Sequence, residues 1–279
     1  MLTRDVSHLP QILLSGFLWA PGFPVMLACV TMGSKSHRKC PSSSAVLSAG
    51  TSCTVTHIME TRTTQNGLFV VIEGADRTGK STQAKMLSEA LTTLTAKKCL
   101  YLKFPDRTTP LGQCLNEYLV GKCDMDPHAL HLLFTANRWE RDTELRSALS
   151  NGCSVVADRY TYSGIAYTAA KVNPTPDWHW CCQMEKGLLE PDIVICLTPD
   201  NIEDLHDRSG YGEERYETDN FQKRVLENYL RLSEEAKAAG EAELAPDQPE
   251  WHFVQATHKS VEEVHKCIIS IVKDKLSLT

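Results

Sequence analysis

The sequence predicts an α/β fold in which a five-stranded parallel sheet carries helices on both faces. Three observations support this: short apolar segments recur along residues 67–279, helical stretches separate them, and a glycine-rich motif follows the first segment. Strands that are apolar at consecutive positions are buried on both faces, which is typical of parallel sheets covered by helices. The predicted strands are Leu68–Ile72, Cys99–Lys103, Cys153–Ala157, Asp192–Leu197 and Trp251–Gln255.

Three helices are predicted from apolar spacing and capping residues. The first follows the glycine-rich motif, and its apolar positions recur at intervals of three and four residues, as on one buried helical face. These positions are Ala84, Leu87, Leu91 and Leu94. Near the C-terminus a capping box at Ser260 and Glu263 precedes a second such stripe. It consists of Val261, Val264, Ile268 and Val272. A third helix is predicted to begin at Asp126, ahead of Pro127, and to run to about Leu149.

Residues 1–58 differ in composition from the rest of the chain. They hold one acidic and four basic residues of a chain with net charge -6. The apolar segment Gln11–Met32 is interrupted by Pro21 and Pro24, so a membrane-spanning helix is not expected there. We predict a poorly structured extension at 1–58 ahead of one domain at 59–279, with a transit peptide and a secretory or membrane segment as alternatives. We expect a cytoplasmic or nuclear protein, or a mitochondrial one if the extension is a transit peptide.

Charge and cysteine content exclude several classes of function. The acidic net charge argues against a nucleic-acid polymer as ligand, which needs a broad basic face, whereas a single nucleotide needs only a few cations. The eleven cysteines include no C-x-x-C pair. No zinc spacing or small-domain disulfide framework fits them, so we expect small buried thiols in a reducing compartment.

A phosphate-binding motif is the strongest functional signal. The run that matches G-x-x-x-x-G-K-[ST], together with the residue after it, is Gly74-Ala75-Asp76-Arg77-Thr78-Gly79-Lys80-Ser81-Thr82. It lies between a predicted strand and a predicted helix, as this motif requires. Backbone N–H groups and the positive end of the helix bind phosphate oxygens, Lys80 reaches the β- and γ-phosphates, and Ser81 offers a hydroxyl to Mg²⁺. The motif alone fits a GTPase, a motor or a kinase equally well.

Two polar clusters follow predicted strands, at the strand ends where open α/β sheets bind ligands. The first is Phe104-Pro105-Asp106-Arg107. The second is Asp158-Arg159-Tyr160, followed by Ser163, Gly164 and Tyr167. For Asp158 and Arg159, a surface ion pair is the alternative.

A third cluster lies on the predicted helix that starts at Pro127. Phe134 and Arg138 are four residues apart, so a ring and a guanidinium point from one helical face into the same space. A ring can stack on a base, and a guanidinium can donate to a base carbonyl. The alternatives are a core aromatic at Phe134 and a solvated charge at Arg138.

Taken together, four segments resemble the thymidylate kinase family of the eukaryotic and poxviral type. They are Glu73–Gln83, Phe104–Arg107, Asn137–Glu140 and Asp158–Tyr167. The resemblance covers about Leu68–Thr279 and implies the P-loop nucleoside monophosphate kinase fold, with a short lid at about 207–218. It implies transfer of the γ-phosphate of ATP to dTMP, with Mg²⁺ as cofactor. We also expect a homodimer.

The resemblance also implies roles for single residues. The catalytic set is Arg77, Lys80, Asp158 and Arg159, and the metal would be held by Ser81 directly and by Asp158 through water. The set implied to bind dTMP is Asp76, Phe104, Arg107, Phe134, Arg138, Arg159, Ser163, Gly164, Tyr167, Tyr216 and Gln222. Within it, Asp76 would hold the 3′-hydroxyl, Arg107 and Arg159 the phosphate, Phe134 and Arg138 the thymine, and Tyr167 would exclude ribonucleotides.

Two alternatives remain for the function, and one expectation concerns Arg77. Another nucleoside monophosphate kinase is one alternative, and a non-catalytic nucleotide switch is the other, although a GTPase switch would need an N-K-x-D motif that the sequence lacks. Because a structural ion pair would be an unusual use of a permanently charged side chain in a phosphate-binding loop, we expect Arg77 to serve the transferred phosphoryl group instead.

Overall fold

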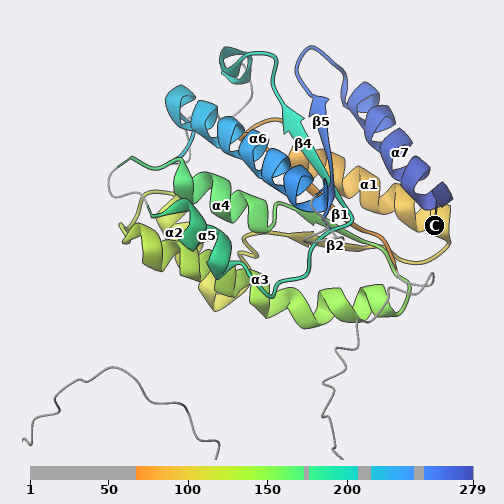
Figure 1. Ribbon diagram of the computed structural model, residues 1–279, viewed down its shortest axis with the longest axis horizontal. Coiled ribbons are helices and arrows are strands. Elements are labelled where there is room, and N and C mark those ends of the chain that lie inside the picture. Colours follow the sequence, from red (N-terminus) through yellow and green to blue (C-terminus); the bar gives the residue numbers. More distant parts are fainter. Residues whose placement is uncertain (1–66, 173–175, 207–214, 242–247, 279) are drawn as a thin grey trace, which may run out of the picture. The chain divides into compact units, whose positions relative to one another are not determined.

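The computed structural model describes residues 67–172, 176–206, 215–241 and 248–278 (Figure 1). The predicted extension at 1–58, with its apolar segment, lies outside the described residues. So does the part of the predicted lid at 207–214. Among the helices of the described residues, none is long and apolar enough to cross a membrane.

A five-stranded parallel sheet forms the centre of the domain, as predicted. Its strands are β1 (Phe69–Gly74), β2 (Leu100–Lys103), β3 (Val155–Asp158), β4 (Ile193–Thr198) and β5 (Glu250–Gln255). The strand order is β2-β3-β1-β4-β5, so β1 lies in the middle with β3 and β4 on either side. The residues that follow β1 and β3 therefore emerge next to each other at the same edge of the sheet.

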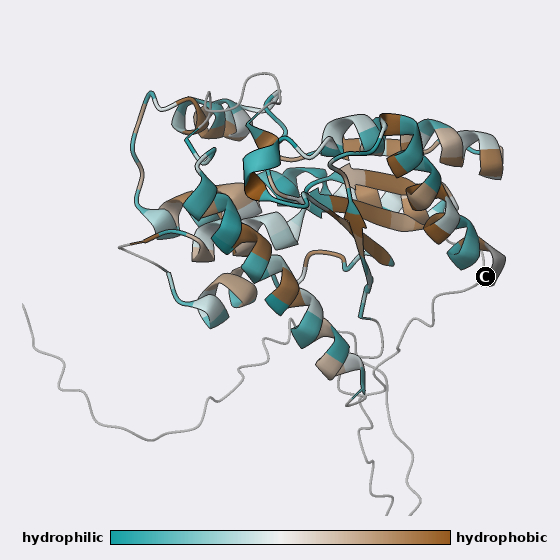
Figure 2. Ribbon diagram, turned by 90° about the horizontal axis from the view of Figure 1, so that it is seen from above, coloured by the Kyte–Doolittle hydropathy of each residue, from teal (hydrophilic) through white to brown (hydrophobic). Residues whose placement is uncertain are grey.

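Helices cover both faces of the sheet (Figure 1). They are α1 (Lys80–Thr95), α2 (Pro110–Leu119), α3 (Pro127–Ser150), α4 (Thr161–Ala169), α5 (Trp178–Met184), the 3₁₀ turn η1 (Ile202–Leu205), α6 (Asp219–Glu241) and α7 (Val261–Leu278). Helices α1 and α7 pack on one face, and α3, α4 and α6 on the other. Figure 2 shows largely apolar strands between helices along which polar and apolar segments alternate. This arrangement explains why the inner strands β1, β3 and β4 are apolar at consecutive positions, whereas the edge strands β2 and β5 are only partly buried.

The predicted helix boundaries and caps are confirmed, and two of the positions predicted to be buried are not. The Asp126 side chain accepts a hydrogen bond from the backbone N–H of His128 at 2.9 Å, and the Ser260 backbone N–H donates to Glu263 at 2.8 Å. Leu94, predicted to lie on the buried face of α1, is 47% exposed, and Val261, predicted to lie on that of α7, is 42% exposed. Leu94 lies in the last turn of α1 and Val261 is the first residue of α7, so both stand at the ends of their stripes.

The described cysteines are all free thiols, as expected, but they are not uniformly buried. Cys99, Cys181 and Cys196 are buried, whereas Cys267 is exposed. Burial raises the pKa of the Cys99 thiol to about 12. This suppresses the reactive thiolate at neutral pH.

Candidate active site

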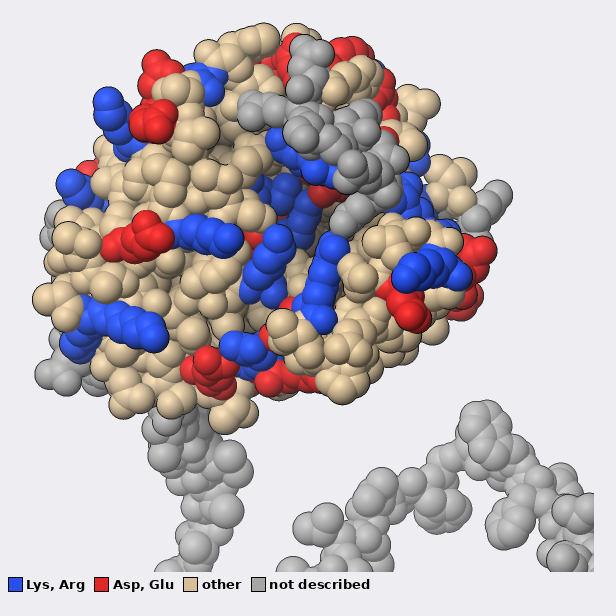
Figure 3. Space-filling view, turned by 180° about the vertical axis from the view of Figure 1, so that it is seen from behind, with Lys and Arg blue, Asp and Glu red and all other residues tan. Residues whose placement is uncertain are grey.

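A cavity of about 460 Å³ opens at the carboxyl ends of β1, β2 and β3. Lys and Arg side chains gather around a hollow on the face shown in Figure 3. The cations that line the cavity are Arg77, Lys80, Lys103, Arg107, Arg138, Arg159 and Lys171. This concentration of positive charge in an acidic chain fits a ligand with several phosphate groups.

The phosphate-binding loop is held by two glycines with positive φ angles. Gly74 has φ 132°, and a Cβ there would lie 2.1 Å from the carbonyl oxygen of Leu197 in β4, so a side chain is excluded. Gly79 has φ 91° and precedes α1. The Lys80 ammonium is buried inside the loop and donates to the carbonyl oxygen of Ala75. Burial, with the nearby charge of Arg159, lowers the pKa of Lys80 to about 8.

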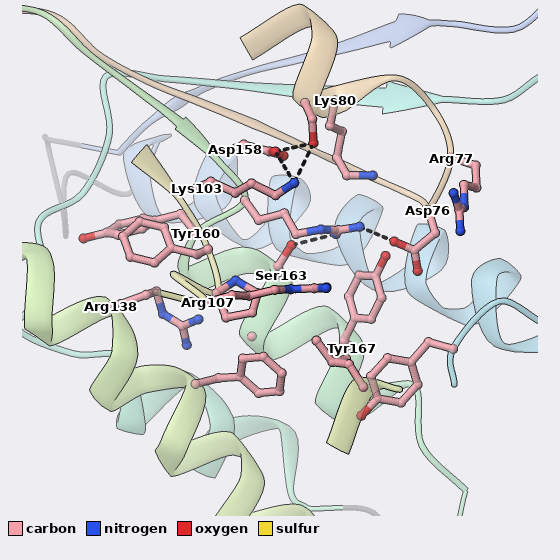
Figure 4. Close-up of a pocket in the computed structure, with 18 of the residues that line it drawn as sticks. Asp76, Arg77, Lys80, Lys103, Arg107, Arg138, Asp158, Tyr160, Ser163 and Tyr167 are labelled. Carbon is pink, nitrogen blue, oxygen red and sulfur yellow. Dashed lines mark hydrogen bonds and ion pairs between the residues drawn. The ribbon is translucent and has the colours of Figure 1, made fainter. Parts of the chain in front are cut away.

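Oxygen ligands suited to a divalent cation meet beside the loop. Ser81 Oγ donates to Asp158 Oδ2 at 2.5 Å, and the Tyr101 hydroxyl lies 3.4 Å from the same oxygen. Lys103 Nζ lies 3.7 Å from Asp158 Oδ2 and 3.2 Å from Ser81 Oγ. Figure 4 marks the contact between Lys103 and Asp158 with a dashed line. A carboxylate next to a hydroxyl is the hard-oxygen donor set that Mg²⁺ prefers. The predicted pair is thus brought together, and the residues present fit the metal.

Arg159, which directly follows β3, faces the phosphate-binding loop. It pairs with Asp76, donates to Ser163 Oγ at 3.1 Å and lies 4.9 Å above the ring of Tyr167. Burial alone would raise the pKa of Asp76, but the charges of Arg159 and Lys80 outweigh it and hold this pKa below its ordinary value. The alternative of a surface ion pair between Asp158 and Arg159 is therefore wrong, because both residues face the cavity with other partners.

The buried carboxylate of Glu73, for which the sequence predicted no role, supports the turn between β3 and α4 that carries Arg159. Glu73 accepts hydrogen bonds from the backbone N–H of Tyr160 at 2.9 Å and from that of Ser163 at 3.0 Å. It also accepts from Ser163 Oγ at 2.5 Å and from the Tyr229 hydroxyl at 2.9 Å. These bonds fix the start of α4, and with it the arginine, which has a positive φ of 68°. Glu73 thus positions Arg159 against the loop.

Phe134 and Arg138 both line the cavity, as their spacing predicts. Arg138 is only 3% exposed and pairs with Glu185, with Nε 3.0 Å from Oε2, so the alternative of a solvated charge is wrong. A Cβ at Gly164 would lie 2.6 Å from both partners of this pair, so a side chain there would displace the pair. Burial raises the pKa of Glu185, and Arg138 opposes that shift. Phe134 also packs on the apolar cluster of α2 and α3, so the core alternative is partly right.

The remaining dTMP-binding candidates occupy several positions around the cavity. Arg107 lines it and donates to Asn116 Oδ1 at 2.9 Å. Phe104 is buried in the wall, with its ring centroid 5.7 Å from that of Tyr160. Tyr216 lines the cavity, whereas Gln222 lies behind it and donates to Asp76 Oδ2 at 2.8 Å. Gln222 is therefore placed to hold Asp76 rather than to face a ligand.

The lid base, residues 215–218, is the described end of the predicted lid. Arg215 donates to Asp124 Oδ1 at 2.6 Å and to the Cys123 carbonyl at 2.9 Å, so it points to the loop after α2. Glu217 forms an ion pair with Arg77, with Nε 2.6 Å from Oε1. The expectation that Arg77 makes no structural ion pair is thus wrong. Lys103, Glu185 and Glu217 are site residues that the sequence reasoning missed.

A phosphate-binding loop at the edge of a parallel sheet, faced by arginines across a cavity, defines a P-loop nucleotide phosphotransferase. The thymidylate kinase family model matches residues 72–268. The chain is 42% identical over 207 residues to the thymidylate kinase of Dictyostelium discoideum, covering 74% of this chain and 85% of that one. It is 39% identical over 212 residues to that of Homo sapiens, covering 76% and 92%. The chain belongs to the thymidylate kinase family.

A solved structure supports the same assignment. The thymidylate kinase of Candida albicans superposes with a TM-score of 0.64 at 34% identity, covering 75% of this chain and 92% of that one. The fold is thus that of the P-loop nucleoside monophosphate kinases. The predicted fold class and family are both confirmed.

Proposed function

We infer that this chain transfers the γ-phosphate of ATP to dTMP, giving dTDP and ADP. The observation that carries the inference is one cavity that joins two kinds of binding group. Lys80 and Arg159 lie at its phosphate-loop end, and Phe134 and Arg138 line the same cavity from α3. Such an arrangement suits two phosphorylated substrates that meet end to end, with a base held at the end formed by α3.

The acceptor needs no general base. The second pKa of a phosphate monoester is about 6, so dTMP is already largely a dianion at neutral pH. The obstacle is the repulsion between two anionic phosphates, and catalysis consists of charge neutralisation and in-line positioning. We assign the loop from Gly74 to Thr82 to ATP, and Arg107 and Arg159 to the phosphate of dTMP. Ser81 and Asp158 would hold Mg²⁺, which when bound would neutralise negative charge on the ATP phosphates.

A coupled assay of ADP release with competing acceptors tests the substrate. We expect turnover with dTMP, weaker turnover with dUMP, and little with UMP or AMP. The pair of Tyr167 and Arg159 closes the space beside Asp76, where a 2′-hydroxyl would need room. Faster turnover with UMP or AMP than with dTMP would favour the alternative of another nucleoside monophosphate kinase.

Arg138→Ala should raise the KM for dTMP by about 10- to 100-fold, because one charge-assisted hydrogen bond to the base contributes roughly 1.5–3 kcal/mol. The KM for ATP should change little, since the donor binds at the other end of the cavity. Steady-state kinetics with each substrate varied in turn measures both values.

Arg146→Ala is the matched control, because this arginine lies on the same helix and pairs with Asp142 at 2.7 Å outside the cavity. An equal rise in both KM values for Arg138→Ala would show that Arg138 does not act at the acceptor base.

The affinity for ATP should depend on the charge of Lys80. Its pKa of about 8 means that the ammonium is present below this pH and is lost above it. We therefore expect kcat/KM for ATP, which reports the unliganded enzyme, to fall above about pH 8. Burial also lowers the pKa of Lys171 to about 8. Lys171→Met separates the two residues: the alkaline fall should persist in this variant, and its disappearance would assign the fall to Lys171.

Residues 1–58 should add nothing to catalysis, because the family match covers residues 72–268 and all five strands lie between Phe69 and Gln255. A chain that starts at Met59 should keep the kcat/KM of the full chain within about twofold. Loss of activity or of cooperative unfolding after truncation would show that the extension belongs to the functional domain.

We also propose that the chain acts as a homodimer. Leu132 and Trp139 are 45% and 44% exposed and lie seven residues apart, hence on one face of α3. A second copy is the occupant that we expect for this apolar face. Sedimentation at micromolar concentration tests the proposal, and a monomeric mass would contradict it.

A further inference from the structure

The phosphate-binding loop is joined to the lid base by the ion pair of Arg77 and Glu217. Arg77 Nε lies 2.6 Å from Oε1 of Glu217, and Arg77 Nη2 lies 3.3 Å from Oε2. Both carboxylate oxygens are engaged, in the forked geometry that fixes a guanidinium in direction as well as in distance. The Glu217 side chain is 3% exposed and that of Arg77 is 28% exposed. The carboxylate is therefore the buried partner, and the arginine lies at the mouth of the cavity.

Glu217 is held in place by bonds on both sides. On one side, Arg215 is fixed to Asp124 and Cys123, and its backbone N–H donates to the carbonyl oxygen of Leu119 at 3.2 Å. On the other side, Gln222 Nε2 donates to the Tyr216 carbonyl oxygen at 2.8 Å. The segment from 215 to 222 is thus attached both to the end of α2 and, through Gln222, to the loop. The carboxylate of Glu217 in this segment therefore provides a fixed point for the long side chain of Arg77.

Arg77 itself has an unusual backbone conformation. Its φ of 62° lies in the left-handed region, which is uncommon for a residue other than glycine and is concentrated at functional sites. The side chain has many rotamers, and ordering them on reaction would cost conformational entropy. A partner that orders the guanidinium beforehand removes this cost from the reaction step.

We propose that Glu217 is a positioning residue that holds the guanidinium of Arg77 ready for the transferred phosphoryl group. The proposal rests on the role of Arg77 under the proposed function. The pair engages Nε and Nη2 of the guanidinium. A guanidinium has five donors in a planar fork, so it can hold a carboxylate on one edge and a phosphoryl oxygen on another.

Glu217→Gln tests the proposal, because it keeps the shape of the side chain and removes its charge. We expect kcat to fall about 10- to 100-fold, by analogy with the loss found when a group that orients a metal ligand is removed. Both KM values should stay within about threefold, because the residue acts on the reaction step. Glu203→Gln is the matched control: this exposed glutamate pairs with Lys223 at 3.5 Å, and its loss should leave kcat unchanged.

A double-mutant cycle with Arg77→Ala separates positioning from a purely structural role. If Glu217 acts through Arg77, Glu217→Gln should cause no further loss of kcat in the Arg77→Ala background. An equal loss in both backgrounds, or a kcat that rises because the pair had withdrawn Arg77 from the site, would overturn the proposal. Glu217→Asp, which keeps the charge on a shorter side chain, should give an intermediate kcat if the Gln variant fails to fold. A normal kcat for Arg77→Ala alone would instead refute the role of Arg77.

Discussion

Arg77→Ala should lower kcat by about 100-fold or more while leaving the KM for ATP and for dTMP nearly unchanged. An arginine that stabilises charge on a transferred phosphoryl group contributes in the transition state rather than in the bound ground state. Residues in comparable roles contribute about 10³–10⁵ in rate. Arg77→Lys should recover part of the loss, since it keeps the charge but not the planar fork. Steady-state kinetics with both substrates varied measures these effects.

The ion pair with Glu217 adds a second effect to the same variant. Removing Arg77 leaves a carboxylate that is 3% exposed without this partner, so we expect a stability loss of about 1–3 kcal/mol. Thermal unfolding measures it, and assays well below the melting temperature keep it separate from kcat. A near-normal kcat would contradict the role of Arg77. Arg215 is poorly placed to replace it, because it points to Asp124, and Arg208 lies outside the described residues.

Asp158→Asn should lower kcat by about 100-fold or more and shift the Mg²⁺ dependence of the reaction to higher concentrations. Asp158 is 1% exposed and meets Ser81 at the edge of the phosphate-binding loop. An asparagine can still accept the hydrogen bond from Ser81, but it lacks the negative charge that attracts a divalent cation. Loss of one preorganised electrostatic group in a catalytic site typically costs about 10²–10³ in rate.

Asp142→Asn provides the matched control, because Asp142 is also buried and paired but does not line the cavity. It should lower stability without changing the Mg²⁺ titration of kcat. If Asp158→Asn keeps the Mg²⁺ dependence of the unmodified chain, the metal is not held by Asp158.

The parts of the fold that depend on local sequence could be predicted. The inner strands β1, β3 and β4 were visible because burial on both faces requires consecutive apolar residues. The loop was visible because glycine and lysine must stand at fixed spacing. Phe134 and Arg138 could be placed in one cavity because helical geometry sets their direction. Lys103 could have been found from the position of its strand. It is the last residue of β2 and lies beside Asp158 of β3 in the sheet register, and alternate residues of a strand share a face.

The partners of the functional arginines could not be predicted. Glu185 lies 47 positions from Arg138, and Glu217 lies 140 positions from Arg77. In the sequence each is one acidic residue among many, and acidic residues are mostly solvated on protein surfaces. Glu185 is buried beside Arg138 only because α3 packs against α5. Glu217 is buried beside Arg77 only because the chain returns to the phosphate-binding loop just before α6. The ion pair of Arg77 was not predicted for this reason.

The most direct test of the account is detection of dTDP formed from dTMP and ATP by the purified chain. The reaction should yield dTDP and ADP in equal amounts and require a divalent cation. It should be lost in Lys80→Met, because this variant removes the ammonium group that lies inside the phosphate-binding loop. That variant also shows whether a contaminating kinase contributes. ATP consumption without dTDP, or dTDP formation that Lys80→Met leaves unchanged, would contradict phosphoryl transfer to dTMP at this site.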